Sequence, residues 1–230
     1  MRTLNESLKA LDEHYLETLK YVGRNFDVNL EMLQNNSFNP TLYGEAKMIE
    51  DFINSFEVKL KEDSIITMAR FQPAAKNLRK LVMIINSVRV LERMGDLLKA
   101  NLSLIKDIEK KSPNLAYALS EKVLPIAKKI RGLFQMYVDA FLNEDVRLLY
   151  NVLYLDEEID DLINANTDYF LTKMKETPDN VVGGSELMLL DKKFERLSDH
   201  IIHLASDLIY ILNGENTRKA ELQNKGKGNQ

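Results

Sequence analysis

Acidic residues four positions apart recur along this sequence, inside segments whose apolar residues have helical spacing. Glu92 and Asp96 belong to the segment Leu-Glu-Arg-Met-Gly-Asp, and a near copy, Phe-Glu-Arg-Leu-Ser-Asp, contains Glu195 and Asp199. Residues four apart share one face of an α-helix, so each pair presents two carboxylates together. Their repulsion costs roughly 0.2 to 0.5 kcal/mol in an isolated helix. A cation, water or a nearby arginine is therefore expected beside each pair.

Further acidic residues lie in the helical segments that precede these two copies. Glu50 lies in the first of these segments, and Asp156 and Asp160 lie in the second. His203 follows Asp199 by four residues and shares its face. Oxygen-rich clusters of this kind suit hard or intermediate cations, and the candidate ions are magnesium, manganese, iron and zinc. The candidate metal ligands are Glu50, Glu92, Asp96, Asp156, Asp160, Glu195, Asp199 and His203.

The same residues have a second interpretation, as an ordinary solvated charged face. Arg89, Arg93 and Arg196 lie close to the carboxylates along the chain and would balance their charge. In that case His203 is only the partner of Asp199 in a surface pair. The residue types and spacing leave both interpretations open.

The composition restricts the class of protein. The chain has 230 residues, of which 45% are hydrophobic and 29% are charged, enough for one elongated domain or two small ones. A net charge of −4 does not suggest a nucleic-acid partner. There is no cysteine, which excludes disulfides and thiolate metal sites and fits a reducing compartment. No apolar run approaches the roughly 20 residues that span a bilayer, and the N-terminus does not read as a signal peptide.

Helical apolar spacing covers nearly the whole sequence, and glycine and proline are scarce, so we predict an all-α protein. We expect a kink at Pro125, a loop over 177–184 and disorder in the polar tail 215–230. The expected helices are 3–33, 41–69, a third that opens with Pro73 and ends at 110–114, then 113–141, 144–175 and 185–213.

The third helix has the longest apolar seam, which indicates packing in a helical bundle. A glycine inside a helix costs about 1 kcal/mol relative to alanine. Gly95 therefore suggests close helix packing or access to the neighbouring carboxylates. The seam consists of Leu81, Ile84, Val88, Leu91, Gly95, Leu98, Leu102 and Ile105.

The second half of the sequence repeats the first. The column Ile84, Leu91, Leu98, Ile105 returns 103 residues later as Leu187, Phe194, Ile201, Leu208. The column Ile49, Ile53, Phe56 returns 106 residues later as Leu155, Ile159, Leu162. At the same shift, Glu50 and Asn54 correspond to Asp156 and Asp160. Two matching helices in the same order indicate a tandem pair of three-helix units, 1–110 and 111–214, with antiparallel neighbouring helices.

With these features in view, the chain resembles the PhoU family, the phosphate-specific transport regulators of bacteria. The resemblance covers about residues 3 to 213 and rests on the two Glu-Arg-x-x-Asp segments and on residues 70–79, Arg-Phe-Gln-Pro-Ala-Ala-Lys-Asn-Leu-Arg. It implies two three-helix bundles with six long helices. It also implies metal on the acidic segments, because some members hold metal ions or multinuclear iron clusters there. The matching positions in 70–79 are Gln72, Pro73, Ala75, Leu78 and Arg79.

The chain departs from the family pattern at three positions. Asn77 stands where family members usually carry aspartate, and His203 stands where they tend to carry asparagine. Asn54 stands where a second acid would complete the acidic pair on the second helix. These departures weaken the expectation of metal binding more in the first unit than in the second.

The resemblance implies a non-enzymatic, cytoplasmic regulator, brought to the inner face of the membrane by its partners. Those partners are the ATPase subunit of a phosphate ABC transporter and a sensor histidine kinase. Contact with them would hold down phosphate uptake and phosphate-starvation genes when phosphate is plentiful, and a bound metal would make this docking metal-dependent. A homodimer is compatible with the sequence. Arg70 and Arg79 either meet an acidic partner or phosphate, or tie a helix start to its neighbours.

Enzyme chemistry has little support in the residues. There is no Glu-x-x-His pattern of di-iron bundles and no glycine-rich phosphate loop. Without cysteine and with three histidines, nucleophile–base pairs are scarce. The alternatives to a docking protein are a metal-dependent enzyme or metal store built on the acidic clusters, and a helical scaffold whose acidic stripes only increase solubility.

Overall fold

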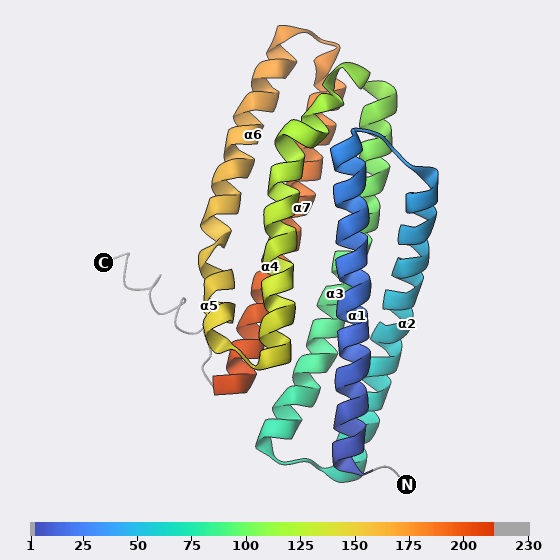
Figure 1. Ribbon diagram of the computed structural model, residues 1–230, viewed down its shortest axis with the longest axis vertical. Coiled ribbons are helices and arrows are strands. Elements are labelled where there is room, and N and C mark those ends of the chain that lie inside the picture. The colour runs from blue at the N-terminus through green and yellow to red at the C-terminus, as the bar shows by residue number, and fades with distance from the viewer. Residues whose placement is uncertain (1–2, 214–230) are drawn as a thin grey trace, which may run out of the picture.

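The computed structural model describes residues 3–213, apart from the side chains of Asp156 and Glu157. Within these residues the regular structure is helical, which confirms the predicted all-α class. No helix of this part of the chain is long and apolar enough to cross a membrane. The tail predicted to be disordered, 215–230, lies outside the described residues. The α-helices are α1 (Leu4–Asn35), α2 (Pro40–Phe71), α3 (Ala75–Lys111), α4 (Leu124–Asn143), α5 (Val146–Tyr154), α6 (Asp156–Glu176) and α7 (Asn180–Asn213) (Figure 1).

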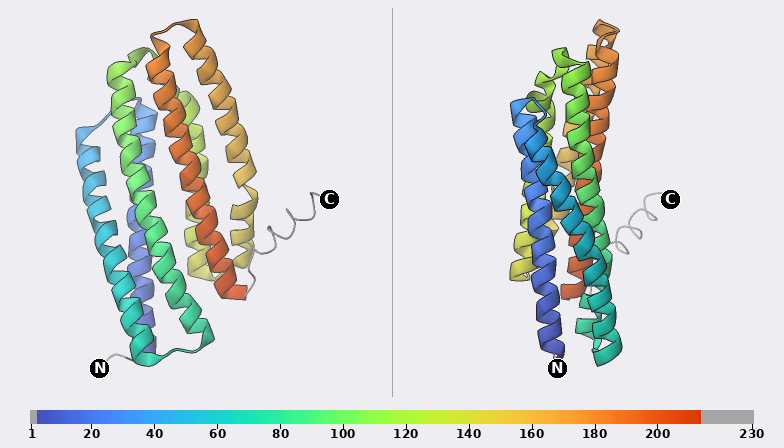
Figure 2. Two further views of the ribbon diagram at one scale, coloured as in Figure 1. Left: turned by 180° about the vertical axis from the view of Figure 1, so that it is seen from behind. Right: turned by 90° about the vertical axis from the view of Figure 1, so that its right-hand side faces the viewer.

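The helices run along the long axis of the molecule and form two layers (Figures 1 and 2). Seen from behind, α2, α3, α7 and α6 lie side by side in one row, with α3 and α7 at its centre (Figure 2). We call this row the four-helix face. In the other layer α1 packs on α2 and α3, and α4 packs on α7. The two halves of the chain therefore meet along two helix pairs, α3 with α7 and α1 with α4.

The predicted apolar seams form the core. Every residue of the α3 seam from Leu81 to Ile105 is buried, and so are its four counterparts in α7. Burial of these side chains supplies the hydrophobic free energy that holds the layers together. At Gly95 a Cβ atom would lie 3.1 Å from Cδ1 of Ile53. Of the two expectations for Gly95, close helix packing is therefore confirmed, and the helix it packs on is α2.

The connection between α2 and α3 differs slightly from the prediction. Gln72 ends α2 in the left-handed conformation, with φ 45°. Ala74 has an extended backbone at φ −74° and ψ 163°, so α3 starts only at Ala75. Pro73 consequently lies in the connection, and its predicted place in the first turn of the helix was wrong.

The single helix predicted over 144–175 was also wrong, because the helix is interrupted at Leu155 and forms two helices, α5 and α6. Leu155 has ψ −3°, far from the roughly −42° of an α-helix. Acidic residues occupy 156–158, directly after the break. The helix dipole favours acidic residues in a first turn over the middle of a helix, which accounts for a new helix starting there.

Pro125 perturbs the fourth predicted helix through a π-helical turn. Pro113–Leu115 form a 3-10 turn, and Leu119–Val123 form a π-helix directly before α4. Proline has no N–H group, and its ring crowds the carbonyl four residues earlier. The wider turn before Pro125 accommodates both effects. The continuous helix predicted from residue 113 is therefore interrupted.

The loop predicted over 177–184 is shorter, because α7 already begins at Asn180. Gly183 and Gly184 thus lie inside a helix, and close packing explains them better than a turn. A Cβ atom on Gly183 would lie 2.5 Å from Cβ of Ser112. One on Gly184 would lie 2.7 Å from Cε of Met174. Both glycines let α7 approach its neighbours closely.

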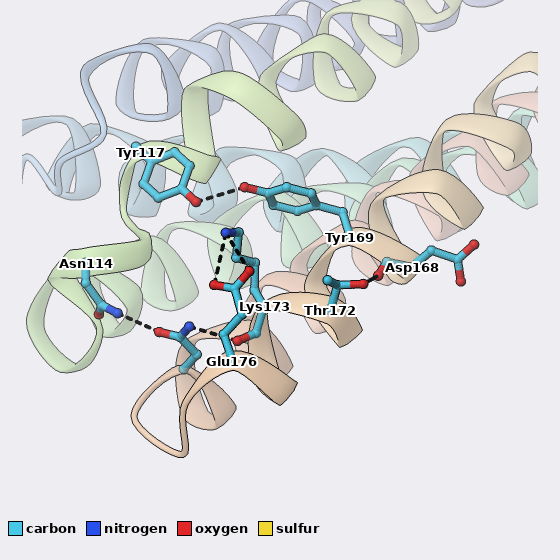
Figure 3. Close-up of polar contacts among 8 residues, drawn as sticks. Asn114, Tyr117, Asp168, Tyr169, Thr172, Lys173 and Glu176 are labelled. Atoms are coloured by element: carbon cyan, nitrogen blue, oxygen red, sulfur yellow. Dashed lines mark hydrogen bonds and ion pairs between the residues drawn. The ribbon is translucent and has the colours of Figure 1, made fainter.

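Side-chain hydrogen bonds join residues 114–117, at the start of the second half of the chain, to α6 and α7 (Figure 3). The hydroxyl groups of Tyr117 and Tyr169 are 2.8 Å apart. This hydrogen bond, with burial, raises the pKa of Tyr169 to about 12. Nδ2 of Asn114 donates to Oδ1 of Asn180 over 2.6 Å. These bonds hold the connection after α3 against α6 and α7.

Candidate functional site

The acidic residues of the first half gather between α2 and α3. Glu50 lies on α2, and Glu92 and Asp96 lie on α3. Lys99 of α3 donates a hydrogen bond from Nζ to Oε2 of Glu50 over 2.5 Å. The Glu50 side chain is 10% exposed and that of Lys99 is 32% exposed. The structure thus brings the predicted acids together with a lysine to which the sequence alone assigned no role.

Crowding shifts the pKa values of these carboxyl groups. Burial raises the pKa of Glu92, and the charges of Asp96 and Glu57 raise it further. Burial and a hydrogen bond with Glu50 raise the pKa of Asp96. Burial acts in the same direction on Glu50, but hydrogen bonds with Lys99 and Asp96 outweigh it and lower the pKa of Glu50. The hydrogen bond between the two carboxyl groups thus shifts their pKa values in opposite directions, down for Glu50 and up for Asp96.

The candidate ligands of the second half are more exposed. Asp160 on α6 is exposed, as are Asp199 and His203 on α7, and Glu195 is half-buried. Glu195 forms an ion pair with a residue one turn earlier on α7, Lys192. The remaining candidate, Asp156, has a side chain outside the described part of the structure.

Among the side chains that the structure describes, no three Asp, Glu or His groups lie close enough together to hold a metal ion. In the first unit the Lys99 ammonium already hydrogen-bonds the Glu50 carboxylate, and Asn54 supplies no charge. These residues do not fit a bound cation. In the second unit the candidates are carboxylates and one imidazole, a donor set that suits manganese, iron or zinc. The repeat places Ile202, an uncharged residue, at the position of Lys99.

A positively charged groove of about 640 Å³ lies between α3 and α7. Arg93 of the first repeat and Arg196 of the second both line it, so the two copies of the Glu-Arg-x-x-Asp segment meet there. Both ring nitrogens of His200 are buried and have no hydrogen-bond partner within residues 3–213. Sequence spacing could not reveal this groove, because it depends on how α3 packs on α7. Its lining residues are Arg93, Asp96, Leu97, Ala100, Lys193, Arg196 and His200.

Arg70 and Arg79 occupy different surroundings. Arg70 lies in the last turn of α2, with its guanidinium carbon 5.0 Å from the ring centre of Phe71. Arg79 has a buried Nε and lines a pocket between α3 and α7 together with Asp207. Arg79 therefore lies where the two halves of the chain meet, whereas Arg70 lies at a helix end.

Fold and site together define a class of helical protein in which two bundles repeat the same acidic segment. A family model described as the PhoU domain matches residues 4–104 and 123–208. These two matches cover most of the chain, one in each half. The chain therefore belongs to the PhoU family.

Relatives from distant bacteria match nearly the whole chain. The phosphate-specific transport system accessory protein PhoU homolog of Deinococcus radiodurans is 26% identical over 215 residues, 92% of this chain and 97% of that protein. The homolog of the same name from Aquifex aeolicus is 26% identical over 224 residues, 97% of this chain and 99% of that protein.

Two crystal structures share the fold. PhoU from Pseudomonas aeruginosa aligns with a TM-score of 0.84 and 25% identity, covering 93% of this chain and all of the other. The phosphate transport system regulatory protein PhoU from Streptococcus pneumoniae aligns with a TM-score of 0.82 and 20% identity, covering 93% and 98%. The second likeness concerns the fold alone.

Proposed function

We propose that this protein regulates phosphate transport as a non-enzymatic accessory protein that docks on partner proteins. Family membership supports the proposal, since the relatives in D. radiodurans and A. aeolicus are named as accessory proteins of phosphate-specific transport. The observation that carries it is the four-helix face, whose two central helices each bring one copy of the Glu-Arg-x-x-Asp segment. Long, rigid helices side by side suit the binding of a protein surface better than the enclosure of a small substrate.

The proposed partners are the ATPase subunit of a phosphate ABC transporter and a sensor histidine kinase, met in the cytoplasm at the inner face of the membrane. Docking there would lower phosphate uptake and starvation signalling when phosphate is plentiful. Its two central helices, α3 and α7, carry the two copies of the acidic segment, and the positively charged groove lies between these helices. Such a charge pattern orients a partner of complementary charge and speeds its association.

Charge reversal tests the docking face. We expect Glu195→Lys/Asp199→Lys to weaken binding to the purified ATPase subunit or kinase about tenfold or more, measured by surface plasmon resonance. The matched control is Glu13→Lys/Glu17→Lys, an exposed acidic pair of the same spacing on α1, in the other layer. The control should bind like the wild type. Equal binding by both variants would rule out docking through the second acidic cluster.

We further propose that a metal ion in the second unit makes docking metal-dependent. When bound, the ion would neutralise neighbouring carboxylates and join α6 to α7. Elemental analysis of protein purified without chelators tests this, with Glu195→Ala/Asp199→Ala as the control. Stoichiometric metal that disappears in the control supports the proposal, and a metal-free wild type overturns the metal dependence. Turnover or tight metal storage without any partner would indicate the alternative, an enzyme or metal store. The proposed ligands are Asp156, Asp160, Glu195, Asp199 and His203.

A further inference from the structure

We infer that Lys99 takes the place of a metal ion in the first unit, so that an ammonium group built into the chain holds the acidic cluster around Glu50. The inference deepens the proposed function, because it confines any metal dependence to the second unit. Its starting point is a contact between α2 and α3 that joins residues 49 positions apart.

The geometry gives the ammonium a place close to the carboxylate. Nζ of Lys99 lies 2.5 Å from Oε2 of Glu50, within a strong charge-assisted hydrogen bond. Because the Glu50 side chain is only 10% exposed, water screens this pair less than an ion pair on the open surface. Removing the ammonium would leave a buried, unpaired carboxylate, which is costly. The cluster is therefore built around a cation that the chain itself supplies.

The neighbouring residues point the same way. Asn54, one turn after Glu50 on α2, carries an amide where its counterpart Asp160 carries a carboxylate. Glu57, seven residues after Glu50 on α2, forms an ion pair with Lys61. The first cluster, made of Glu50, Glu92 and Asp96, thus has one carboxylate fewer than the second, and its buried acid, Glu50, already has a lysine partner.

The second unit lacks this arrangement at the corresponding positions. The repeat aligns Lys99 with Ile202 and Glu50 with Asp156. The lysine that pairs with Glu195 is Lys192, which corresponds to Arg89 of the first unit and not to Lys99. The two units therefore differ where a shared cation would lie: the first has an ammonium, and the second has an aliphatic side chain.

An ammonium in this position opposes metal binding in two ways. It hydrogen-bonds the carboxylate oxygen that the metal would bind, and its charge repels a divalent ion at short distance. It is also present whatever the metal supply. The α2–α3 side of the four-helix face therefore stays the same whatever the metal supply, and only the α6–α7 side responds to metal.

The test counts Mn²⁺ sites on the full chain by isothermal titration calorimetry. Lys99→Met keeps the length of the side chain without its charge, and Lys99→Arg keeps the charge. We expect the methionine variant to bind about one more Mn²⁺ per chain than the wild type, and Lys99→Met/Glu50→Gln to lose that extra ion. The arginine variant should bind like the wild type. A folded methionine variant that gains no Mn²⁺ would overturn the inference.

Two further variants keep the test decisive if the methionine variant does not fold. Glu50→Gln in the otherwise unchanged chain should leave Mn²⁺ binding as it is, whereas lost binding would show that Glu50 ligates metal despite Lys99. Ile202→Lys should weaken Mn²⁺ binding in the second unit about tenfold, with Ile202→Met as its matched control. A wild type that binds no Mn²⁺, together with a methionine variant that does, would contradict the metal proposed for the second unit and support the inference.

Discussion

The phenolic oxygens of Tyr15 and Tyr137 lie 2.7 Å apart in the core where α1 meets α4. Both side chains are fully buried, and this hydrogen bond joins the first half of the chain to the second. Burial raises the pKa of Tyr15 to about 12 and that of Tyr137 well above its ordinary value. Both rings therefore stay protonated at neutral pH, and one hydroxyl donates to the other.

Removing one of these hydroxyls should cost more than half of the unfolding free energy that is lost when both are removed. Tyr15→Phe or Tyr137→Phe leaves a buried hydroxyl without its partner, at about 1 to 3 kcal/mol of unfolding free energy. The double variant leaves no unpaired hydroxyl. Its loss of unfolding free energy should therefore be smaller than the sum of the two single losses by about 0.5 kcal/mol or more. Urea unfolding of the four proteins measures this coupling. Strict additivity would contradict it, and the exposed Tyr210→Phe serves as a control with little effect.

Gly183 should be intolerant of even a methyl group. The Cβ of Gly183→Ala would lie 2.5 Å from Cβ of Ser112, so α7 must move away from the connection after α3. We expect a loss of about 1 to 3 kcal/mol of unfolding free energy, as for other overpacked sites. In Gly132→Ala on α4 the new Cβ has no described atom within 4 Å beyond its own stretch of helix, so this control should gain up to about 1 kcal/mol. Equal denaturant midpoints for the two variants would contradict the packing argument.

Asp191 should make stability depend on pH. Its side chain is 1% exposed, and burial raises its pKa to about 7, partly opposed by the hydrogen bond from Nδ2 of Asn166 over 2.9 Å. Because folding raises this pKa, the contribution of the carboxyl group to the unfolding free energy is largest below about pH 4, the ordinary pKa of aspartate. That contribution is lost as the pH rises to about 7, amounting to roughly 4 kcal/mol.

Urea unfolding between about pH 4 and pH 8 measures this dependence. We expect the wild type to lose stability relative to Asp191→Asn as the pH rises, because the amide cannot ionise. A constant difference between the two proteins across that range would show that folding does not shift the pKa of Asp191.

His200 should stay neutral far below the usual range for histidine. Burial, followed by the charges of His203, Arg196 and Arg93, lowers the pKa of His200 to about 4. Nuclear magnetic resonance of the imidazole protons should follow its titration. Arg93→Gln/Arg196→Gln should raise this pKa, because two of the opposing charges are gone. Arg70→Gln, at the far end of α2, should leave it unchanged. A midpoint in the wild type near 6.5 would contradict the buried position in the groove.

The helices and their apolar seams could be predicted from the sequence because both arise from local periodicity. Leu81, Val88 and Leu98 recur at helical spacing, and the structure buries all three. The recurrence of Glu92 and Asp96 as Glu195 and Asp199 reveals the repeat in the sequence itself. The ends of helices were harder to predict. Leu155 has no glycine or proline beside it to indicate that a helix ends there. Gly183 indicates a loop in the sequence, and only its close contact with Ser112 explains why it lies inside a helix.

The candidate site depended on tertiary structure more than the core did. Spacing placed Glu92 and Asp96 on one face of a helix, but it could not place Lys99 beside Glu50. The groove with Arg93 and Arg196 likewise exists only because α3 packs on α7. Periodicity along one helix determines which residues share a face. Which charges from other helices reach that face is decided by helix packing, because the partners of Glu50 and Arg93 are distant in sequence and close only in the folded chain.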